Sequence, residues 1–296
     1  LTDFFDNVYL PDVMTLASIY RDYFSIGKGV ENFLSFGLFD LDDEPDVTKR
    51  KRLFPMGRMV KGKILPVDPK KITEDVKYSW YDSPSHRYPL EASTVPNPDK
   101  ARAYSWLKSP RYDGVAYEVG PLARVAMAYV SKSSPAIVKL VDEALTSLSV
   151  GPSHLYSVMG RHIARAIECK VVADALQEMI LQVKLDEPVC TNHTIPQEAE
   201  GMGLWCAARG ALGHWVRIKD GKIARYQAVV PTTWNASPRD DAGQPGPIEA
   251  ALLGVQVEDT NNPFELARIV RSFDPCIACA VHLFEPGKQV RTLRML

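Results

Sequence analysis

Residues 151–180 read GPSHLYSVMGRHIARAIECKVVADALQEMI, and this stretch decides the kind of fold that the chain adopts. After the Gly-Pro-Ser break at its start, apolar side chains recur at every fourth position: Leu155, Met159, Ile163, Ile167 and Val171, with Leu176 and Ile180 continuing the stripe. Such spacing places the side chains on one face of an α-helix. The pattern therefore predicts a long buried helix.

The regions upstream of this helix contain further helices and irregular segments. Residues 11–25 mix apolar and polar side chains at roughly helical spacing. Pro121 suits the first turn of another helix, and Ser134-Pro135 separates that helix from a third. Residues 40–100 are rich in Pro, Asp and Lys, which predicts loops and small strands, with Val60 to Leu65 as one extended piece.

The regions downstream contain a β-hairpin and two short helices. Asp186 to Gly203 is interpreted as a polar connector. Trp215 to Lys219 and Lys222 to Val230 are β-prone runs on either side of Asp220-Gly221, a strong hairpin signal. The many Pro and Gly residues of 231–247 predict no regular structure, and short helices are expected at Glu249 to Gly254 and Pro263 to Phe273. We therefore expect an α+β fold, mostly helical, with long buried helices and small β-hairpin elements, in which residues 1–296 form a single unit.

Composition excludes several classes of protein. Lys plus Arg number 35 against 36 for Asp plus Glu, a net charge of −1, so no broad basic surface predicts a nucleic-acid partner. The five cysteines, at positions 169, 190, 206, 276 and 279, do not resemble a disulfide ladder and suggest thiols or ligands. No apolar run approaches the roughly 20 residues that span a bilayer. The start at Leu1-Thr2 carries no signal peptide, and we expect the chain to be a fragment that begins at an internal cut.

The sharpest local signal for chemistry is DPCIACAVH, residues 274–282. Two thiols three positions apart, Cys276 and Cys279, can face one point when the chain turns, and thiolates are strong ligands for nickel and iron. On spacing alone, a redox dithiol and half of a structural zinc site remain open alternatives. The chain has neither a second Cys-x-x-Cys pair nor a His-x-x-x-His pair, so the motif is interpreted as an incomplete metal site.

The Asp-Pro-Cys-x-x-Cys-x-x-His motif near the C-terminus resembles the last motif of nickel–iron hydrogenase large subunits. Five further segments resemble motifs of the same family and occur in the family's order along the chain. They are YEVGPLAR at 117–124, GRH at 160–162, ARGALGHW at 208–215, VVPTTWN at 229–235 and SPRD at 237–240. Several motifs in the right order are more specific than any single one. Cys206 and Ala208 depart from the pattern, because relatives usually have glutamate and often proline at these positions, which predicts a different outer wall of the pocket.

The resemblance implies a nickel–iron centre whose iron carries carbon monoxide and cyanide. Cys276 would be a terminal nickel ligand and Cys279 would bridge the two metals, with two more cysteines from a segment outside this chain. Arg209 would place a guanidinium above the metals, oriented by Asp274. Val230, Pro231 and Thr232 would line the pocket, where Thr232 could donate to a cyanide nitrogen. Taken without the family, Arg209 would be an ordinary ion-pair residue, and Thr232 and Asp274 would cap turns.

The resemblance also implies a second metal and several partners. His282 would ligate magnesium or iron, with the backbone carbonyl of Ala228 as a further ligand. Residues 283–296 resemble a C-terminal tail that a maturation endopeptidase removes after nickel insertion. Electrons from hydrogen oxidation would leave through a small subunit that holds the iron–sulfur clusters, in a heterodimer of the respiratory uptake type. That subunit would carry the enzyme to the periplasmic face of the membrane, where it could contact a membrane cytochrome.

Three alternatives remain beside this interpretation. A hydrogen-sensing relative generally lacks the removable tail, so residues 283–296 argue against it. The related subunit of NADH–quinone oxidoreductase has lost the cysteine ligands, so Cys276 and Cys279 argue against that relative. A non-catalytic zinc-binding protein would be distinguished by its metal content.

Overall fold

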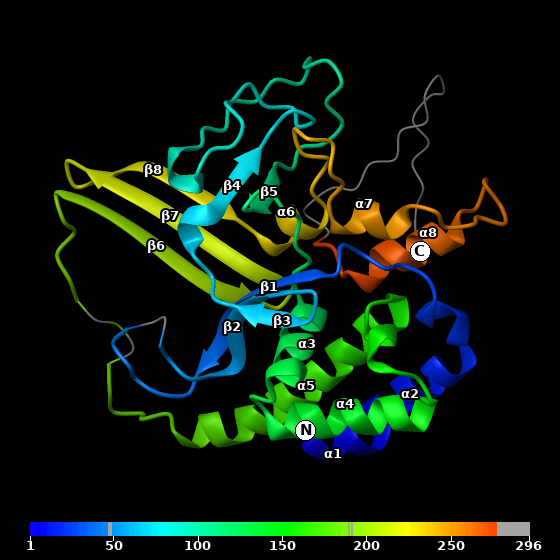
Figure 1. The fold of residues 1–296 in the computed structure, drawn as a ribbon. Helices are drawn as coiled ribbons and strands as arrows, with labels where there is room; N and C mark the ends of the chain where they lie inside the picture. Colours follow the sequence, from blue (N-terminus) through cyan, green and yellow to red (C-terminus); the bar gives the residue numbers. More distant parts are fainter. Residues whose placement is uncertain (47–48, 189, 191, 277–296) are drawn as a thin grey trace.

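The long helix expected from the quoted stretch is present. The structure, a computed structural model, describes residues 1–46, 49–188, 190 and 192–276. Helix α5 (Val158–Leu181) starts at Ser157, whose Oγ accepts a hydrogen bond from Gly160 N (3.0 Å). It contacts three other helices in one layer (Figure 1): α2 (Leu10–Ile19), α3 (Pro121–Ser131) and α4 (Pro135–Leu148). These confirm the predicted helices, except that the one expected over residues 11–25 ends at Ile19 and is followed by a 3-10 turn.

The C-terminal part of α5 differs from the expectation. Leu176 and Ile180 are 46% and 70% exposed, so the prediction that they continue the buried stripe is wrong. The buried residues of α5 end at Ala173, and its last turns run past α3 and α4 (Figure 1). Spacing along a helix therefore identified the buried face, but not where the partner helices end.

In the described part of the chain, three small antiparallel sheets accompany the helices. The first has the order β1-β2-β3, with β1 at Asn32–Asp40, β2 at Arg52–Val60 and β3 at Lys63–Leu65. The expected extended piece Val60 to Leu65 is instead a hairpin that turns at Lys61-Gly62, where both φ angles are positive (49° and 72°). The second sheet pairs β4 (Ile72–Asp75) with β5 (Ser109–Tyr112).

The third sheet contains the predicted hairpin and one strand that was missed. It has the order β6-β7-β8: β6 (Glu198–Ala207), β7 (Gly210–Lys219) and β8 (Lys222–Val229). The turn at Asp220-Gly221 is confirmed. The prediction of a connector up to Gly203 is wrong from Glu198 onward, where β6 begins. The strand was missed because it lies at the edge of the sheet, where its first residues are largely exposed and lack alternating apolar side chains.

The remaining elements are short. Residues 231–247 were expected to lack regular structure, but Pro231–Asn235 forms the single-turn helix α6. The two expected short helices are confirmed as α7 (Pro247–Leu252) and α8 (Phe264–Ser272). The N-terminus forms α1 (Thr2–Phe4), followed by a π-helical turn at Phe5–Tyr9. Short 3-10 turns lie at Arg21–Phe24, Pro69–Lys71, Pro89–Glu91 and Pro152–Leu155.

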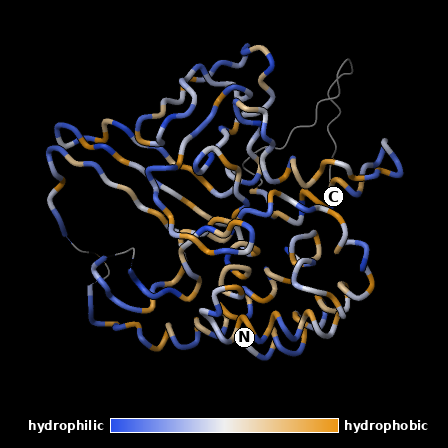
Figure 2. The backbone as a smooth tube through the Cα atoms, viewed as in Figure 1, coloured by the Kyte–Doolittle hydropathy of each residue, from blue (hydrophilic) through white to orange (hydrophobic). Residues whose placement is uncertain are grey.

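The core joins the helical layer to the sheets. One apolar cluster includes Phe36 of β1, Met127 of α3, Ile163 of α5 and Trp215 of β7, and Figure 2 shows apolar residues along these elements. A smaller cluster connects the start of α5 with α7 and α8. Side chains from the helices and from the small sheets thus pack into one common core, as expected for an α+β fold. Within the described residues, no helix combines the length and apolarity that a membrane crossing needs.

Candidate functional site

Arg209 lies in the tight turn that joins β6 to β7. Ala207 pairs with Gly210, so Ala208 and Arg209 form a two-residue hairpin loop. Gly210 has a φ of +130°, and a Cβ there would lie 2.6 Å from Gly120 N. Only glycine allows the strand to start so close to the backbone that precedes α3. The turn and its arginine are therefore held against Gly120.

Asp274 lies beside Arg209, although the two residues are far apart in the sequence. Arg209 Nε donates to the main-chain oxygen of Asp274 (2.7 Å), and Nη2 donates to its Oδ1 (3.2 Å). Asp274 follows α8 with a φ of +50°, and its own N–H donates to Arg271 O (2.9 Å). Both side chains are partly exposed, at 40% and 45%. The left-handed turn after α8 thus directs Asp274 toward the hairpin loop.

Cys276 lies beside the first turn of α6. Its backbone N–H donates to Thr232 Oγ1 (3.3 Å). Thr232 and Pro231 are buried, and Val230, at the N-cap of α6, is half-buried. The described part of the cysteine motif therefore lies against the segment that was expected to line a pocket.

The remaining predicted ligands are less completely placed. Ala228 lies in β8, paired with His214 of β7, two residues before the segment at Val230. Cys279 and His282, like the tail at 283–296, fall outside the described residues. The two substituted positions lie just before Arg209: Cys206 is buried with its Sγ 3.5 Å from Ser35 Oγ, whereas Ala208 is exposed.

The residues present suit a soft transition metal. Cys276 offers a thiol, which as a thiolate is a preferred ligand for nickel and iron. The residue is half-buried, and its backbone is held by the hydroxyl of Thr232, so the backbone that carries the thiol is ordered by a neighbouring side chain. Arg209 adds a positive charge to the same segment, because it bonds Asp274, two residues before Cys276.

Buried arginines that motif reading left without a role anchor the segments of this site. Arg124 of α3 is fully buried, and its Nε and Nη2 each donate to the carboxylate of Glu168 at 2.6 Å. Its Nη1 and Nη2 also donate to the carbonyls of Ala207 (3.1 Å) and Ala208 (2.7 Å). Although burial alone favours the neutral guanidine, the charge of Glu168 raises the pKa of Arg124. Arg124 thus holds the backbone directly before Arg209.

A second buried pair anchors the backbone before Asp274. Arg161 of α5 donates twice to the carboxylate of Glu118 (2.8 Å each) and once to Gly27 O (2.7 Å). Its guanidinium lies over the ring of Phe273, 3.7 Å from the centroid. One helical turn later, Arg165 donates to Ser272 O (2.9 Å). The end of α8 is therefore fixed to α5.

The loop after α6 is held in the same way. Arg111 of β5 donates to Asp240 Oδ2 (2.7 Å), Ser237 Oγ (3.1 Å) and Gln244 O (2.9 Å). At the end of α6, Asn235 exchanges two hydrogen bonds with the backbone of Val119 (3.0 and 2.8 Å). Arg161 and Glu118 both lie in quoted motifs, whereas the pairs Arg124–Glu168 and Arg111–Asp240 have only one member in a motif. The motifs therefore gave only a partial signal for these anchors.

The close approach at Gly210 predicts a measurable cost. Gly210→Ala is expected to lower the free energy of unfolding by about 1–3 kcal/mol, because the new Cβ meets the backbone of Gly120. Gly114→Ala is the matched control, since Gly114 also has a positive φ (+72°) but no atom within 4 Å of an added Cβ. Thermal unfolding of the complete protein would measure both, and equal shifts for the two variants would contradict the role given to the contact.

Comparison with known proteins places this site in a family context. A family model described as nickel-dependent hydrogenase matches residues 1–282. The periplasmic [NiFeSe] hydrogenase large subunit of Desulfomicrobium baculatum is 42% identical over 95% of this chain and 55% of its own length. The uptake hydrogenase large subunit of Azotobacter chroococcum is 39% identical over 98% of this chain and 55% of its own length.

The fold agrees with a solved structure from the same group. The Ni-Fe-Se hydrogenase of Desulfovibrio vulgaris Hildenborough superposes with a TM-score of 0.84 and 41% identity, covering 95% of this chain and 59% of that one. This chain therefore spans about half the length of the curated relatives that it matches.

Proposed function

Because this chain belongs to the nickel-dependent hydrogenase family, we propose that it is part of the catalytic large subunit of a nickel–iron hydrogenase. The proposed reaction is hydrogen oxidation, H2 to two protons and two electrons. The observation that carries the proposal is the arrangement of Cys276 against Thr232, two residues from an Asp274 that bonds Arg209.

The metal centre is proposed to be held at the cysteine motif. Cys276 and Cys279 would supply two thiolate ligands, and the rest of the first shell would come from protein outside this chain. When bound, a nickel–iron centre with carbon monoxide and cyanide on iron would supply the chemistry for heterolytic hydrogen cleavage. Thr232 Oγ1 and the wall formed by Val230 and Pro231 would restrict water and orient the site.

The protein groups have separate proposed roles. The Sγ atom of Cys276 would serve as a base that accepts a proton. Arg209 would contribute a fixed positive charge and N–H donors, since its bonds to Asp274 use Nε and Nη2 and leave Nη1 for other partners. Asp274 would orient this guanidinium, so both residues belong to the proposed catalytic machinery.

The wider assembly is also a proposal. The electrons would pass to a small subunit that carries the iron–sulfur clusters, and the heterodimer would act in hydrogen uptake, as the names of relatives at 36–39% identity suggest. His282 and the carbonyl of Ala228 would bind magnesium or iron at a second site. A maturation endopeptidase would remove residues 283–296. A periplasmic location, with contact to a membrane cytochrome through the small subunit, is supported by one relative named as periplasmic.

The test uses the complete large subunit produced with its small subunit. Hydrogen-dependent reduction of benzyl viologen and nickel content by mass spectrometry are measured for wild type and Cys276→Ser. The variant is expected to lose nickel and at least about 100-fold in activity, because a hydroxyl is a poor ligand for a soft metal. Cys190→Ser, at an exposed cysteine, is the matched control and should keep both.

Two results would contradict the proposed function. A wild-type complex that holds zinc in place of nickel would favour the non-catalytic metal-binding alternative. A nickel-loaded complex that reduces no acceptor with hydrogen, while binding hydrogen reversibly, would favour a sensor.

A further inference from the structure

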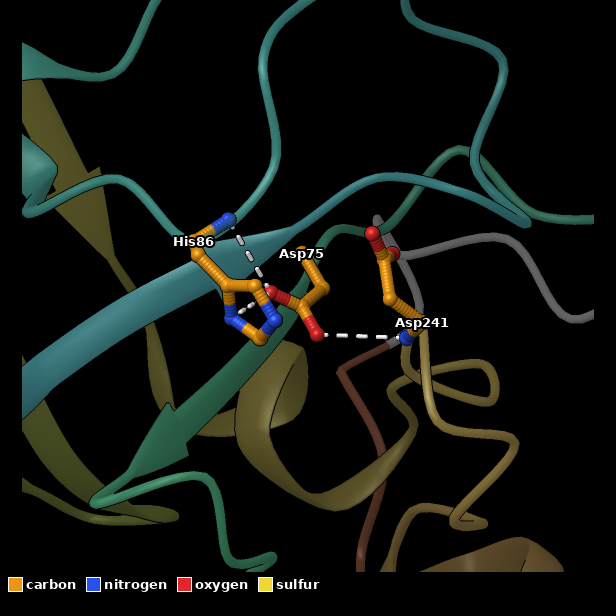
Figure 3. Close-up of side chains that lie close together, drawn as sticks. All are labelled: Asp75, His86 and Asp241. Atoms are coloured by element: carbon orange, nitrogen blue, oxygen red, sulfur yellow. Dashed lines mark hydrogen bonds and ion pairs between the residues drawn. The ribbon is translucent and has the colours of Figure 1, made fainter.

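Three side chains with metal-ligand atoms meet beside β4, among residues that the proposed nickel–iron site does not use. Asp75 ends β4, His86 lies in the loop that follows, and Asp241 lies in the loop after α6 (Figure 3). One ligand atom from each residue lies within 4.8 Å of the other two. Asp75 and His86 are 11 positions apart, whereas Asp241 lies 166 positions from Asp75.

Asp75 is the buried member of the group. Its side chain is 2% exposed, and its Oδ1 lies 2.9 Å from His86 Nδ1 and accepts from His86 N (3.1 Å). Its Oδ2 accepts from Asp241 N (3.2 Å). His86, from the loop after β4, and the backbone N–H of Asp241, from the loop after α6, therefore both bond to the carboxylate of Asp75, as the dashed lines of Figure 3 show.

Asp241 brings a second carboxylate without a matching permanent cation. Its Oδ1 accepts from Lys77 N (3.3 Å) and Ser85 Oγ (3.1 Å), while Lys77 Nζ donates to its main-chain oxygen (2.9 Å). Across the described ranges, no Lys or Arg side chain forms an ion pair with either carboxylate. The imidazole of His86 carries a positive charge only when it is protonated.

The electrostatics of the pair favour an added cation. Burial raises the pKa of Asp75, and the negative charge of Asp241 raises it further, against the opposing hydrogen bonds from the backbone. Two carboxylates in such proximity repel each other when both are ionised. A divalent ion between them would remove that repulsion and would be attracted by both.

We propose that Asp75, His86 and Asp241 bind a divalent transition-metal ion of the zinc class. One imidazole nitrogen and two carboxylate oxygens form a ligand set that zinc accepts at about 2.0–2.2 Å. Magnesium and calcium prefer oxygen ligands alone, so the imidazole selects against them. His86 is exposed enough to turn toward the ion, since its side chain is 64% accessible. The ion would connect the loop after β4 to the loop after α6.

The test measures zinc binding by the complete heterodimer in parallel with variants of the site. Equilibrium dialysis against zinc chloride, followed by metal analysis, gives the zinc bound per molecule. Wild type is expected to bind one more equivalent than His86→Ala, whose affinity should fall at least about tenfold with one ligand lost. Asp241→Asn supplies a second variant if His86→Ala fails to fold. His154→Ala, at another exposed histidine, is the matched control and should bind as wild type does.

Each outcome decides the proposal. Loss of one equivalent in both site variants, with hydrogen oxidation and nickel content unchanged, supports a separate zinc-class site. Equal zinc binding by wild type and His86→Ala overturns it, as does wild-type protein that binds no zinc, because His86 and Asp75 would then form only an ion pair. These results are independent of the proposed hydrogenase activity, since none of the three residues belongs to the proposed nickel–iron site.

Discussion

Arg209→Lys is expected to lower the rate of hydrogen oxidation by about 100-fold or more, the usual loss when one preorganised charged donor is removed from an active site. A lysine retains the charge, but it has a single donor nitrogen on a flexible stem and no planar fork, so it cannot reproduce the two separate positions from which Nε and Nη2 donate to Asp274 (2.7 and 3.2 Å). The charge would then no longer be held in one position. The measurement is the turnover rate with an artificial acceptor, compared with nickel content in the same preparation.

The control for this change is an arginine on β7, the strand that follows the loop of Arg209. Arg217→Lys alters a partly exposed side chain of β7 that pairs with Glu91 and Glu200, and it should leave turnover close to wild type. Nickel content should be unchanged in both variants, because neither residue is a ligand. If Arg209→Lys turned over as fast as Arg217→Lys, Arg209 would have only a structural role. If it instead lost nickel, its role would be in assembling the site.

Glu168→Gln is expected to cost about 3–5 kcal/mol of stability, because it leaves the buried guanidinium of Arg124 without its counter-charge. The two bonds of 2.6 Å between these residues are enclosed in the core, so solvent cannot replace the lost carboxylate. Arg124 also holds the carbonyls of Ala207 and Ala208. We therefore expect lower activity as well, since the turn that carries Arg209 would be less well positioned.

Thermal unfolding and turnover of the same samples test this prediction. Glu143→Gln on α4 is the matched control, because its ion pair with Lys139 is exposed (59% and 75%) and such pairs contribute about 0–1 kcal/mol. A Glu168→Gln protein as stable as Glu143→Gln would show that the buried pair does not anchor the turn. A protein that is destabilised but fully active below its melting temperature would separate the stability role from the positioning role.

Local sequence patterns predicted the elements whose signals are local. The fourfold spacing from Leu155 to Val171 predicted α5, and Asp220-Gly221 predicted the β7–β8 hairpin. The edge strand β6 was missed because an exposed strand needs no apolar alternation. Leu176 and Ile180 were wrongly placed in the core. The spacing of apolar residues along one helix does not say how far the neighbouring helices extend beside it.

The candidate site divides in the same way. The Cys-x-x-Cys spacing indicated Cys276 as a ligand, since ligand chemistry depends on the side chains themselves. Arg209, Asp274 and Thr232 were singled out only through the resemblance carried by several motifs, because their residue types alone favour an ion pair and turn caps. The structure shows the expected bonds between Asp274 and Arg209 across 65 positions. Only the tertiary structure showed that Asp75, His86 and Asp241 come together. Such contacts depend on how separate segments pack, and the free energy that selects one packing is spread over the whole core, including buried arginine pairs that no motif marks as partners.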